Sequence, residues 1–273
     1  LMINLKNENS LLDIAYREKE NYQKSFPFPH IYLDNFFDEK YLDLVVDEFP
    51  DLSLLNDVIK HSGSTDEKLA SPRGDKYQKK YTKKLLSFLN GSEFLDFLKI
   101  LCSINEHLIP DPHFIGGGFH ETKNGGFLKV HADFCKHPEN NLDRRVNVLI
   151  FLNKNWEKAY KGELMLFDKE MKKFKSLLPI FNRVVIFNTT DFTYHGVPDP
   201  LLTPKGITRK SLALYYFSNG RPKEEIRLNN TNNSTIYKKR DGENFKFDIK
   251  KFALELTPPI LFKFIKKLRK KTN

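Results

Sequence analysis

The chain has 273 residues, 40% of them hydrophobic and 13% aromatic, which is enough for a substantial core and excludes a disordered protein. Its formal net charge of +10 indicates anionic partners, without choosing between small molecules, nucleic acid and a membrane surface. Two distant cysteines exclude a disulfide framework. The lack of a signal-peptide core, or of about 18 consecutive apolar residues, leads us to expect a cytoplasmic protein without a transmembrane helix.

The spacing of apolar residues predicts helices within residues 38–108. The first has Asp38 as its N-cap and ends before Pro50, and the second has Ser92 as its cap. The apolar positions of the second are Phe94, Leu98, Leu101 and Leu108. Residues 60–76, between the two helices, are polar and aperiodic and contain Gly, Ser and Pro. We therefore expect a long loop there, either disordered or a mobile cover over a site.

From residue 114 onward the sequence changes to short β-rich runs separated by turn residues such as Asn124-Gly125-Gly126. The runs are FIGGGFHET, FLKVHADF, RRVNVLIFLN, GELMLFD, FKSLLP, NRVVIFNT and RKSLALYYFS. Many short strands separated by such turn residues predict a β-sandwich or barrel rather than a parallel sheet with helical crossovers.

After Ser218 the chain becomes polar, and it closes with a basic segment that has a helical pattern. The apolar positions of this segment are Ile260, Leu261, Phe264, Ile265 and Leu268, with lysines opposite. A terminal helix that docks its apolar side on the barrel is the interpretation that we favour. The alternative is contact of this helix with a membrane surface.

The run FLKVHADF places His131 and Asp133 two residues apart. Because alternate side chains of a strand share a face, the two project together, as neighbouring ligands of one ion would. Taken alone, the two are better explained as a hydrogen-bonded pair at the mouth of a barrel. His195 changes this interpretation, because His-x-Asp followed by a distant second histidine forms the facial triad of non-haem Fe(II) oxygenases. Such a triad leaves three positions open for a chelating co-substrate and O2.

Arg209 lies in the next strand-like run after His195, and Ser211 shares its face. A lone arginine is normally an exposed residue on a sheet. In sequence order with the triad, the guanidinium of Arg209 is better explained as an anchor for a small-molecule carboxylate, which it can bind through two parallel hydrogen bonds.

These residues together resemble the 2-oxoglutarate/Fe(II)-dependent oxygenases, particularly the prolyl-hydroxylase-like branch. Three segments are similar, in their order and in their pattern of apolar and polar residues, to those of the hypoxia-sensing prolyl hydroxylases: RRVNVLIFLNKNW, GELMLFD and TRKSLALYYFS. NGGFLKVHADF resembles the strand that carries the first two ligands in the superfamily. FPFPHIYLDNFFDEKYLDLVVDEFP resembles the helical lead-in of bacterial and viral members, and the whole resemblance spans residues 26–221.

The resemblance implies a mainly β protein with α additions, built on a double-stranded β-helix (a jelly roll, cupin-like) with N-terminal supporting helices. It implies that residues 1–112 form the helical lead-in within the same domain, 113–221 the catalytic core and 222–273 a C-terminal extension. His131, Asp133 and His195 would bind Fe(II), and Arg209 would bind the distal carboxylate of 2-oxoglutarate. O2 would be the oxidant, and ascorbate is a candidate reductant. The implied reaction hydroxylates an unactivated C–H bond of a prolyl residue, amino acid or related small molecule, with succinate and CO2 as co-products.

Two positions depart from the family pattern. Phe151 stands where the oxygen-sensing enzymes have a tyrosine that helps to hold the carboxylate, so Ser211 is a candidate to supply the missing hydroxyl. Thr122 stands where collagen-type prolyl hydroxylases have another tyrosine. Asn147 is expected to face the core, where it either contacts the C1 carboxylate of 2-oxoglutarate or is a satisfied buried amide.

We expect the other polar and aromatic residues discussed below to have structural rather than catalytic roles. Arg144 and Arg145 either frame the mouth of the barrel or form surface ion pairs, and Trp156 and Tyr215 are expected in the core. The remaining histidines have no ligand partners at useful spacing and are expected to be structural or to lie on the surface. These are His113, His120 and His137.

Two further functions fit a β-barrel with these residues. One is a cupin-type metal enzyme that does not use 2-oxoglutarate, and the other is a non-catalytic barrel that serves as a binding module. Only a 2-oxoglutarate enzyme needs Arg209 and Ser211 as a carboxylate anchor deep in the barrel. We expect a small-molecule or peptide substrate rather than nucleic acid, because no aromatic wedge or basic stripe lies near the triad.

Overall fold

The computed structural model describes residues 10–225, 235–240 and 243. The chain divides into two compact units, residues 1–241 and 242–273, and the β-sheet and helices belong to the first. The predicted basic helix that contains Ile260 lies outside the described residues.

The first unit is built on one sheet of 13 strands, in which every pairing between strands is antiparallel. The strands are β1 (His30–Asp34), β2 (Ile59–Ser62), β3 (Asp66–Ala70), β4 (Ile109–Pro110), β5 (Gly118–Thr122), β6 (Phe127–Ala132), β7 (Asp143–Phe151), β8 (Leu164–Phe167), β9 (Phe174–Leu177), β10 (Arg183–Asn188), β11 (Tyr194–Val197), β12 (Arg209–Ser218) and β13 (Ile236–Tyr237). Their order is β1-β10-β7-β12-β5-β3-β6-β11-β8-β9, with β2 on β3, β4 on β12 and β13 on β6.

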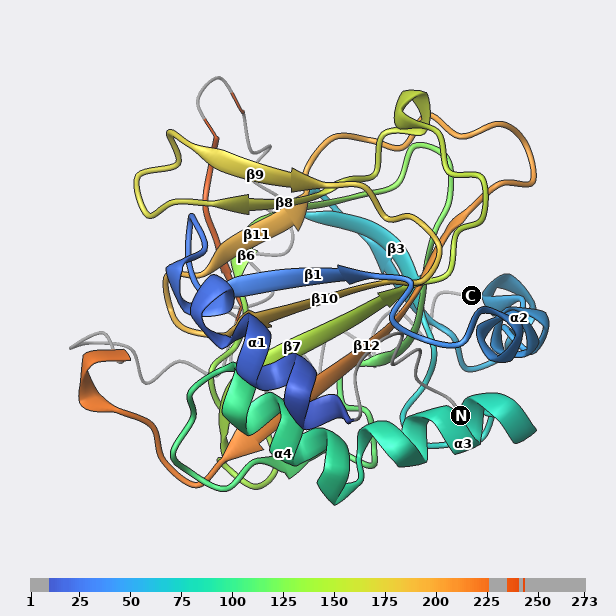
Figure 1. Ribbon diagram of the computed structural model, residues 1–273. Helices are drawn as coiled ribbons and strands as arrows, with labels where there is room; N and C mark the ends of the chain where they lie inside the picture. Colours follow the sequence, from blue (N-terminus) through green and yellow to red (C-terminus); the bar gives the residue numbers. More distant parts are fainter. Residues whose placement is uncertain (1–9, 226–234, 241–242, 244–273) are drawn as a thin grey trace, which may run out of the picture. The chain divides into compact units, whose positions relative to one another are not determined.

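The sheet rolls so that β1, β10, β7 and β12 form one layer and β6, β11, β8 and β9 the other (Figure 1). Strand β3 joins the two layers because it pairs with both β5 and β6. This rolled sheet is a double-stranded β-helix, as the resemblance implies. All seven runs predicted from residue 114 onward contain strands.

In the described part of the chain, four α-helices accompany the sheet: α1 (Leu11–Lys24), α2 (Glu39–Asp47), α3 (Lys80–Leu89) and α4 (Ser92–Leu101), with short 3-10 helices at Leu52–Leu54, Lys158–Tyr160 and Lys223–Glu225. Asp38 caps α2 as predicted, since its side chain accepts from the backbone N–H of Tyr41. The predicted cap of α4 is wrong by one residue, because Gly91 is the N-cap and Ser92 is already helical. Leu108 is buried but lies beyond the end of that helix. None of the helices in the described part is long and apolar enough to cross a membrane.

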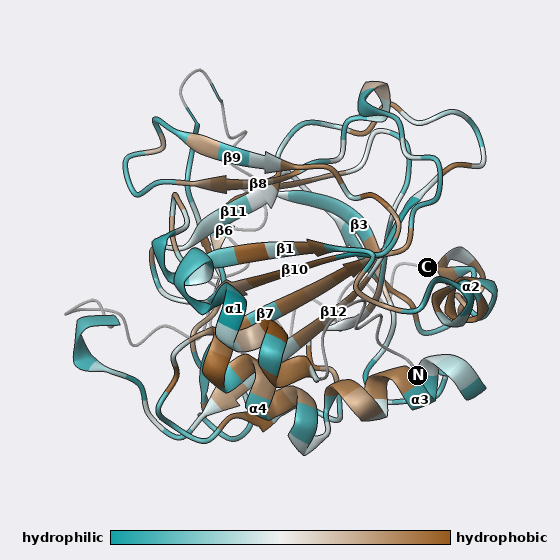
Figure 2. Ribbon diagram, viewed as in Figure 1, coloured by the Kyte–Doolittle hydropathy of each residue, from teal (hydrophilic) through white to brown (hydrophobic). Residues whose placement is uncertain are grey.

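The main core lies between the helices and one face of the sheet. Val184 and Ile186 of β10 belong to the same buried cluster as Phe94 of α4. The intervening Val185 and Phe187 belong to a second, smaller cluster inside the roll. Strands that are buried on both faces read as continuous apolar runs, and β7, β8 and β10 are accordingly largely brown in Figure 2.

Residues 60–70 are not a loop, so the prediction for residues 60–76 is wrong over this part, whereas residues 71–76 belong to no helix or strand. Strands β2 and β3 form a hairpin around Gly63, and β3 contributes backbone pairs on both of its edges. Leu69 pairs with Glu121 of β5, while Glu67 pairs with Phe127 of β6. The hairpin is therefore part of the wall of the roll.

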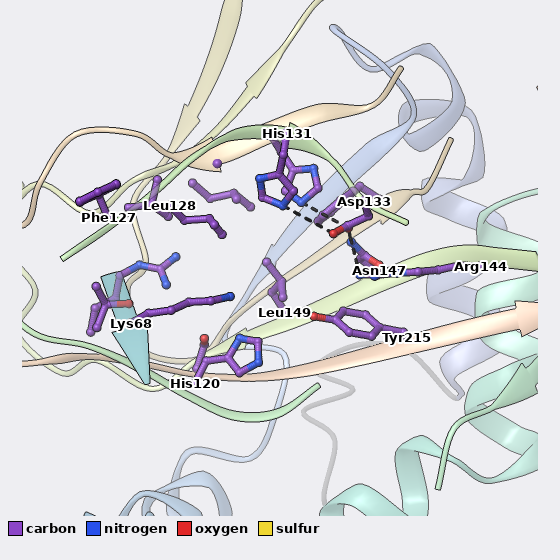
Figure 3. Close-up of a pocket in the computed structure, with 18 residues that line it drawn as sticks. Lys68, His120, Phe127, Leu128, His131, Asp133, Arg144, Asn147, Leu149 and Tyr215 are labelled. Atoms are coloured by element: carbon purple, nitrogen blue, oxygen red, sulfur yellow. Dashed lines mark hydrogen bonds and ion pairs between the residues drawn. The ribbon is translucent and has the colours of Figure 1, made fainter. Parts of the chain in front are cut away.

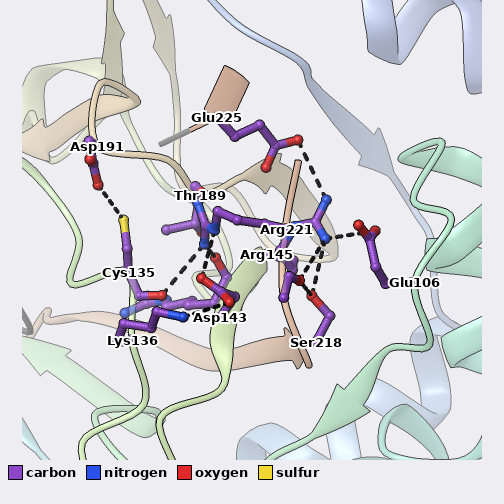
Figure 4. A network of polar contacts seen from close by, with 12 residues as sticks. Glu106, Cys135, Lys136, Asp143, Arg145, Thr189, Asp191, Ser218, Arg221 and Glu225 are labelled. Atoms are coloured by element: carbon purple, nitrogen blue, oxygen red, sulfur yellow. Dashed lines mark hydrogen bonds and ion pairs between the residues drawn. The ribbon is translucent and has the colours of Figure 1, made fainter. Parts of the chain in front are cut away.

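A buried ion pair fastens the residues after β12 to the start of β7 (Figure 4). Arg221 Nε donates to Asp143 Oδ1 at 3.0 Å, and the two side chains are 2% and 5% exposed. Arg221 also donates to the carbonyl of Thr189, and Lys136 pairs with the other oxygen of Asp143 at 2.7 Å.

Replacing Asp143 by alanine should lower the free energy of unfolding by about 3–5 kcal/mol, because Arg221 would remain buried without its counter-charge. The control Arg73→Ala removes an exposed ion pair with Glu139 and should change this free energy by less than about 1 kcal/mol. Urea unfolding of both variants measures the difference. Equal losses in the two variants would contradict the assigned role of Asp143.

Candidate metal and co-substrate site

Three side chains from two neighbouring strands meet in one cavity of the roll (Figure 3). His131 lies on β6, Asp133 follows the end of that strand, and His195 lies on β11. The antiparallel register places His195 directly opposite His131. One ligand atom of each residue lies within 4.8 Å of the other two, so the structure brings together the three residues singled out from the sequence.

Both imidazoles are oriented by the backbone. His131 Nδ1 donates to the carbonyl of Lys129 at 2.8 Å, and His195 Nδ1 donates to that of Thr193 at 3.1 Å. The two Nε2 atoms consequently face Asp133, at 3.5 and 3.4 Å from its oxygens. Burial lowers the pKa of His195 to about 4, against the attraction of Asp133, so at neutral pH the ring is uncharged and Nε2 offers a lone pair.

The carboxylate of Asp133 is fixed from behind by two side chains of β7. Arg144 Nη2 donates to Asp133 Oδ2 at 2.9 Å, and Asn147 Nδ2 donates to the same oxygen at 2.7 Å. Burial raises the pKa of Asp133, but the positive charge of Arg144, with His195 and His131, outweighs it and holds the pKa well below the usual range. Asp133 is therefore an anion at neutral pH.

Asn147 also accepts from Arg144 Nε at 2.9 Å and from the Thr189 hydroxyl at 3.2 Å. These contacts support the buried-amide interpretation of this residue. Its contact with 2-oxoglutarate stays a prediction, although the residue does line the cavity.

The donor set fits a divalent transition metal. Metal–ligand bonds of about 2.0–2.2 Å place neighbouring ligands of an octahedral ion roughly 3 Å apart, close to the separations found here. Two imidazole nitrogens and one carboxylate suit Fe(II), and the same three residues line the cavity.

Arg209 lines the same cavity from β12. Its Nε donates to the carbonyl of Gly162 at 2.8 Å, and the guanidinium lies over the ring of Phe151 with its central carbon 4.9 Å from the ring centroid. No carboxylate of the described residues lies within ion-pair distance of this guanidinium. Burial lowers the pKa of Arg209 to about 10, so the group is still charged at neutral pH. Its two terminal nitrogens remain available to a ligand.

The two residues that replace family tyrosines occupy different places. Thr122 lines the cavity beside Arg209, its register partner. Phe151 is fully buried in the core beneath the guanidinium. Ser211 lines the cavity, and its hydroxyl makes no hydrogen bond to the described residues. Its proposed contact with the carboxylate stays a prediction.

Arg144 and Arg145 are not surface residues, because they are 1% and 4% exposed. Neighbouring positions of a strand face opposite sides. Arg144 therefore reaches Asp133, whereas Arg145 pairs with Glu106 at 2.8 Å, away from the cavity. Tyr215 also lines the cavity, where it stacks on Arg144, whereas Trp156 is buried among apolar residues as expected.

Sequence reasoning missed two residues of the cavity, Lys68 of the hairpin and His120 of β5. His120 could have been found from the period of β5, because it stands two residues before Thr122 on the same face. Nothing local to residues 60–76 indicated that Lys68 points into a site.

Comparisons with known proteins agree with this geometry. Residues 117–217 match the family model described as the 2OG-Fe(II) oxygenase superfamily. No curated protein matches the sequence. The fold is similar to that of a prolyl-4-hydroxylase from Pseudomonas putida, with a TM-score of 0.56 at 14% identity over 76% of this chain and 100% of that one.

Two further structures share the fold. A Trichoplax adhaerens prolyl hydroxylase in complex with a hypoxia-inducible-factor peptide fragment has a TM-score of 0.57 at 18% identity, over 79% of this chain and 96% of that one. HygX from Streptomyces hygroscopicus, with nickel, 2-oxoglutarate and hygromycin B bound, has a TM-score of 0.51 at 12% identity, over 82% and 97%. The matched segment of this chain contains the triad and Arg209. The core of the chain at residues 117–217 is therefore similar in sequence to the 2OG-Fe(II) oxygenase superfamily.

Proposed function

We propose that the chain is a dioxygenase that uses Fe(II), 2-oxoglutarate and O2 to hydroxylate an unactivated C–H bond, with succinate and CO2 as co-products. The observation that carries the proposal is one cavity that holds both the triad and an arginine that pairs with no carboxylate of the described chain. In this proposal His131, Asp133 and His195 hold the iron. The iron supplies the activation of O2.

The other residues of the site position the reactants and exclude water. Arg209 binds the distal carboxylate of 2-oxoglutarate and so fixes its orientation. Arg144 and Asn147 keep the Asp133 carboxylate in place, a task that commonly supports metal affinity. Leu149 and Phe187 give the interior an apolar lining. A carboxylate at position 133, in place of a residue that cannot bind metal, favours hydroxylation over halogenation.

A prolyl residue, an amino acid or a related small molecule is the proposed substrate. Two of the similar structures are prolyl hydroxylases, one of them with a peptide bound, which supports a prolyl or peptide substrate.

Anaerobic addition of 2-oxoglutarate to the Fe(II)-loaded protein tests the proposal. We expect a weak visible charge-transfer band, because the keto acid chelates iron at two of the open positions. Succinate, which lacks the ketone, is the matched control and should give no band. A folded protein that binds Fe(II) without forming this band would point instead to the cupin-type enzyme that does not use 2-oxoglutarate.

A further inference from the structure

Lys68 brings a third cation into the cavity, beside Arg144 and Arg209, from outside the segment that matches the family model. It stands at the centre of β3 and is half-buried. In Figure 3 its amino group reaches into the cavity, with His120 and Tyr215 on the same side and His131 and Asp133 across from it.

The ammonium group has no anionic partner in the part of the chain that the structure describes. Asp66, two residues earlier on the same face, is engaged by His61 at 2.7 Å. No carboxylate lies within 4.0 Å of Lys68 Nζ, and this nitrogen makes no hydrogen bond to the described residues. Burial lowers the pKa of Lys68. This direction is expected for an ammonium group that is removed from water and not fully stabilised by nearby negative charge.

Lys68 is also placed apart from Arg209. Leu69 pairs with Glu121, and Arg209 pairs with Thr122. Lys68 and Arg209 thus lie on either side of β5, two strand spacings or about 10 Å apart at the backbone. Two like charges that start from strands on either side of β5 are suited to two different anionic groups.

The charges that line the cavity support this separation. Among the described residues that line the cavity, Asp133 is the only acidic one, against three cations: Lys68, Arg144 and Arg209. Arg144 neutralises Asp133, and Arg209 matches the distal carboxylate of 2-oxoglutarate. Iron held by the triad would take the other carboxylate of 2-oxoglutarate, so Lys68 would still lack a counter-charge from the described residues with both groups bound.

We propose that Lys68 binds an anionic oxygen group of the substrate, a carboxylate or a phosphate, so that the enzyme acts on negatively charged molecules. The inference rests on the proposed function, since it treats Arg209 as already engaged by 2-oxoglutarate. A lysine suits this task because its three donors on a flexible stem can follow an anion whose exact position varies between substrates. It also rejects neutral analogues, which would leave the ammonium buried and unpaired.

The test compares wild type, Lys68→Met and the control Lys175→Met, which removes an equal charge from the exposed face of β9. Each protein is loaded with Ni(II) and the unreactive 2-oxoglutarate analogue N-oxalylglycine, and its melting temperature is followed against inorganic phosphate and, separately, acetate. We expect the apparent affinity for at least one of these anions to fall at least about tenfold in Lys68→Met and to be unchanged in Lys175→Met. Lys68→Arg should retain part of the response.

A response of Lys68→Met identical to that of wild type for both anions would overturn the proposal. A second measurement distinguishes a carboxylate of the substrate from a carboxylate of 2-oxoglutarate. It is the affinity of each Ni(II)-loaded protein for 2-oxoglutarate, determined by calorimetry. Lys68→Met should remain within about threefold of wild type in this titration, whereas a loss of tenfold or more would assign Lys68 to the co-substrate and refute a substrate role. Failure of wild type itself to bind 2-oxoglutarate would instead refute the proposed function.

Discussion

Replacing His131 by alanine should reduce the affinity for Fe(II) by more than about 100-fold. Loss of residues that only orient metal ligands typically costs about 10- to 100-fold in affinity, and His131 is proposed as a ligand itself. Only Asp133 and His195 would then remain to hold the ion. Anaerobic competition titration against a chromogenic chelator measures the affinity, with circular dichroism to show that the variant is folded.

His120→Ala is the matched control, because His120 carries an imidazole into the same cavity without facing the triad. Its Nε2 contacts the carbonyl of Gly116 at 3.1 Å. This variant should keep its Fe(II) affinity within about threefold of wild type. Full metal binding by His131→Ala, or an equal loss in the two variants, would show that the metal site has been placed wrongly.

Arg209→Met should weaken 2-oxoglutarate binding while metal binding is retained. Removing one partner of a buried charge pair commonly costs about 2–4 kcal/mol, which corresponds to roughly 30- to 700-fold in affinity. Methionine keeps the packing of the stem over Phe151 but removes the fork that holds the carboxylate. Calorimetric titration of 2-oxoglutarate into the Ni(II)-loaded variant gives the change.

Arg183→Met is a suitable control, because Arg183 pairs with Asp34 at 2.6 Å on the outer edge of the sheet. It removes an arginine without reaching the cavity. Arg209→Lys should fall between wild type and Arg209→Met, since it keeps the charge but loses the two parallel hydrogen bonds. If Arg209→Met binds 2-oxoglutarate as wild type does, the carboxylate lies elsewhere and the assignment of Arg209 is wrong.

The strand-rich part of the fold could be predicted because its information is local. The period of two and the turn residues of each run are visible within about ten residues. The same period showed that His131 and Asp133 project together. The meeting of His131 with His195 depends on the register of β6 against β11, which is a long-range property. It could be inferred only from the chemistry of a facial triad.

The hairpin of β2 and β3, residues 59–70, could not be predicted in the same way. One face of β3 carries Asp66 and Lys68 toward the interior, so the strand lacks the apolar alternation that reveals a half-buried strand. Its stabilising pairs are with the backbones of β5 and β6, far along the chain. Backbone pairing does not depend on a particular side-chain pattern. The sequence of a polar strand that is held by such pairs therefore resembles that of a loop.

The neighbouring arginines of β7 show a third limit. A strand pattern predicts that Arg144 and Arg145 face opposite sides, but it does not tell which side is the cavity. Both turned out to be buried, because each finds an acidic partner from another part of the chain, Asp133 for one and Glu106 for the other. Sequence spacing alone cannot supply such partners.

The pairing of one edge of β3 with both β5 and β6 has a consequence for any shortened version of this protein. A fragment that starts at residue 113 would keep every residue of the triad but would leave two adjoining strands with unsatisfied backbone donors and acceptors. Such open edges invite self-association, so we expect this fragment to aggregate rather than to function as a minimal enzyme.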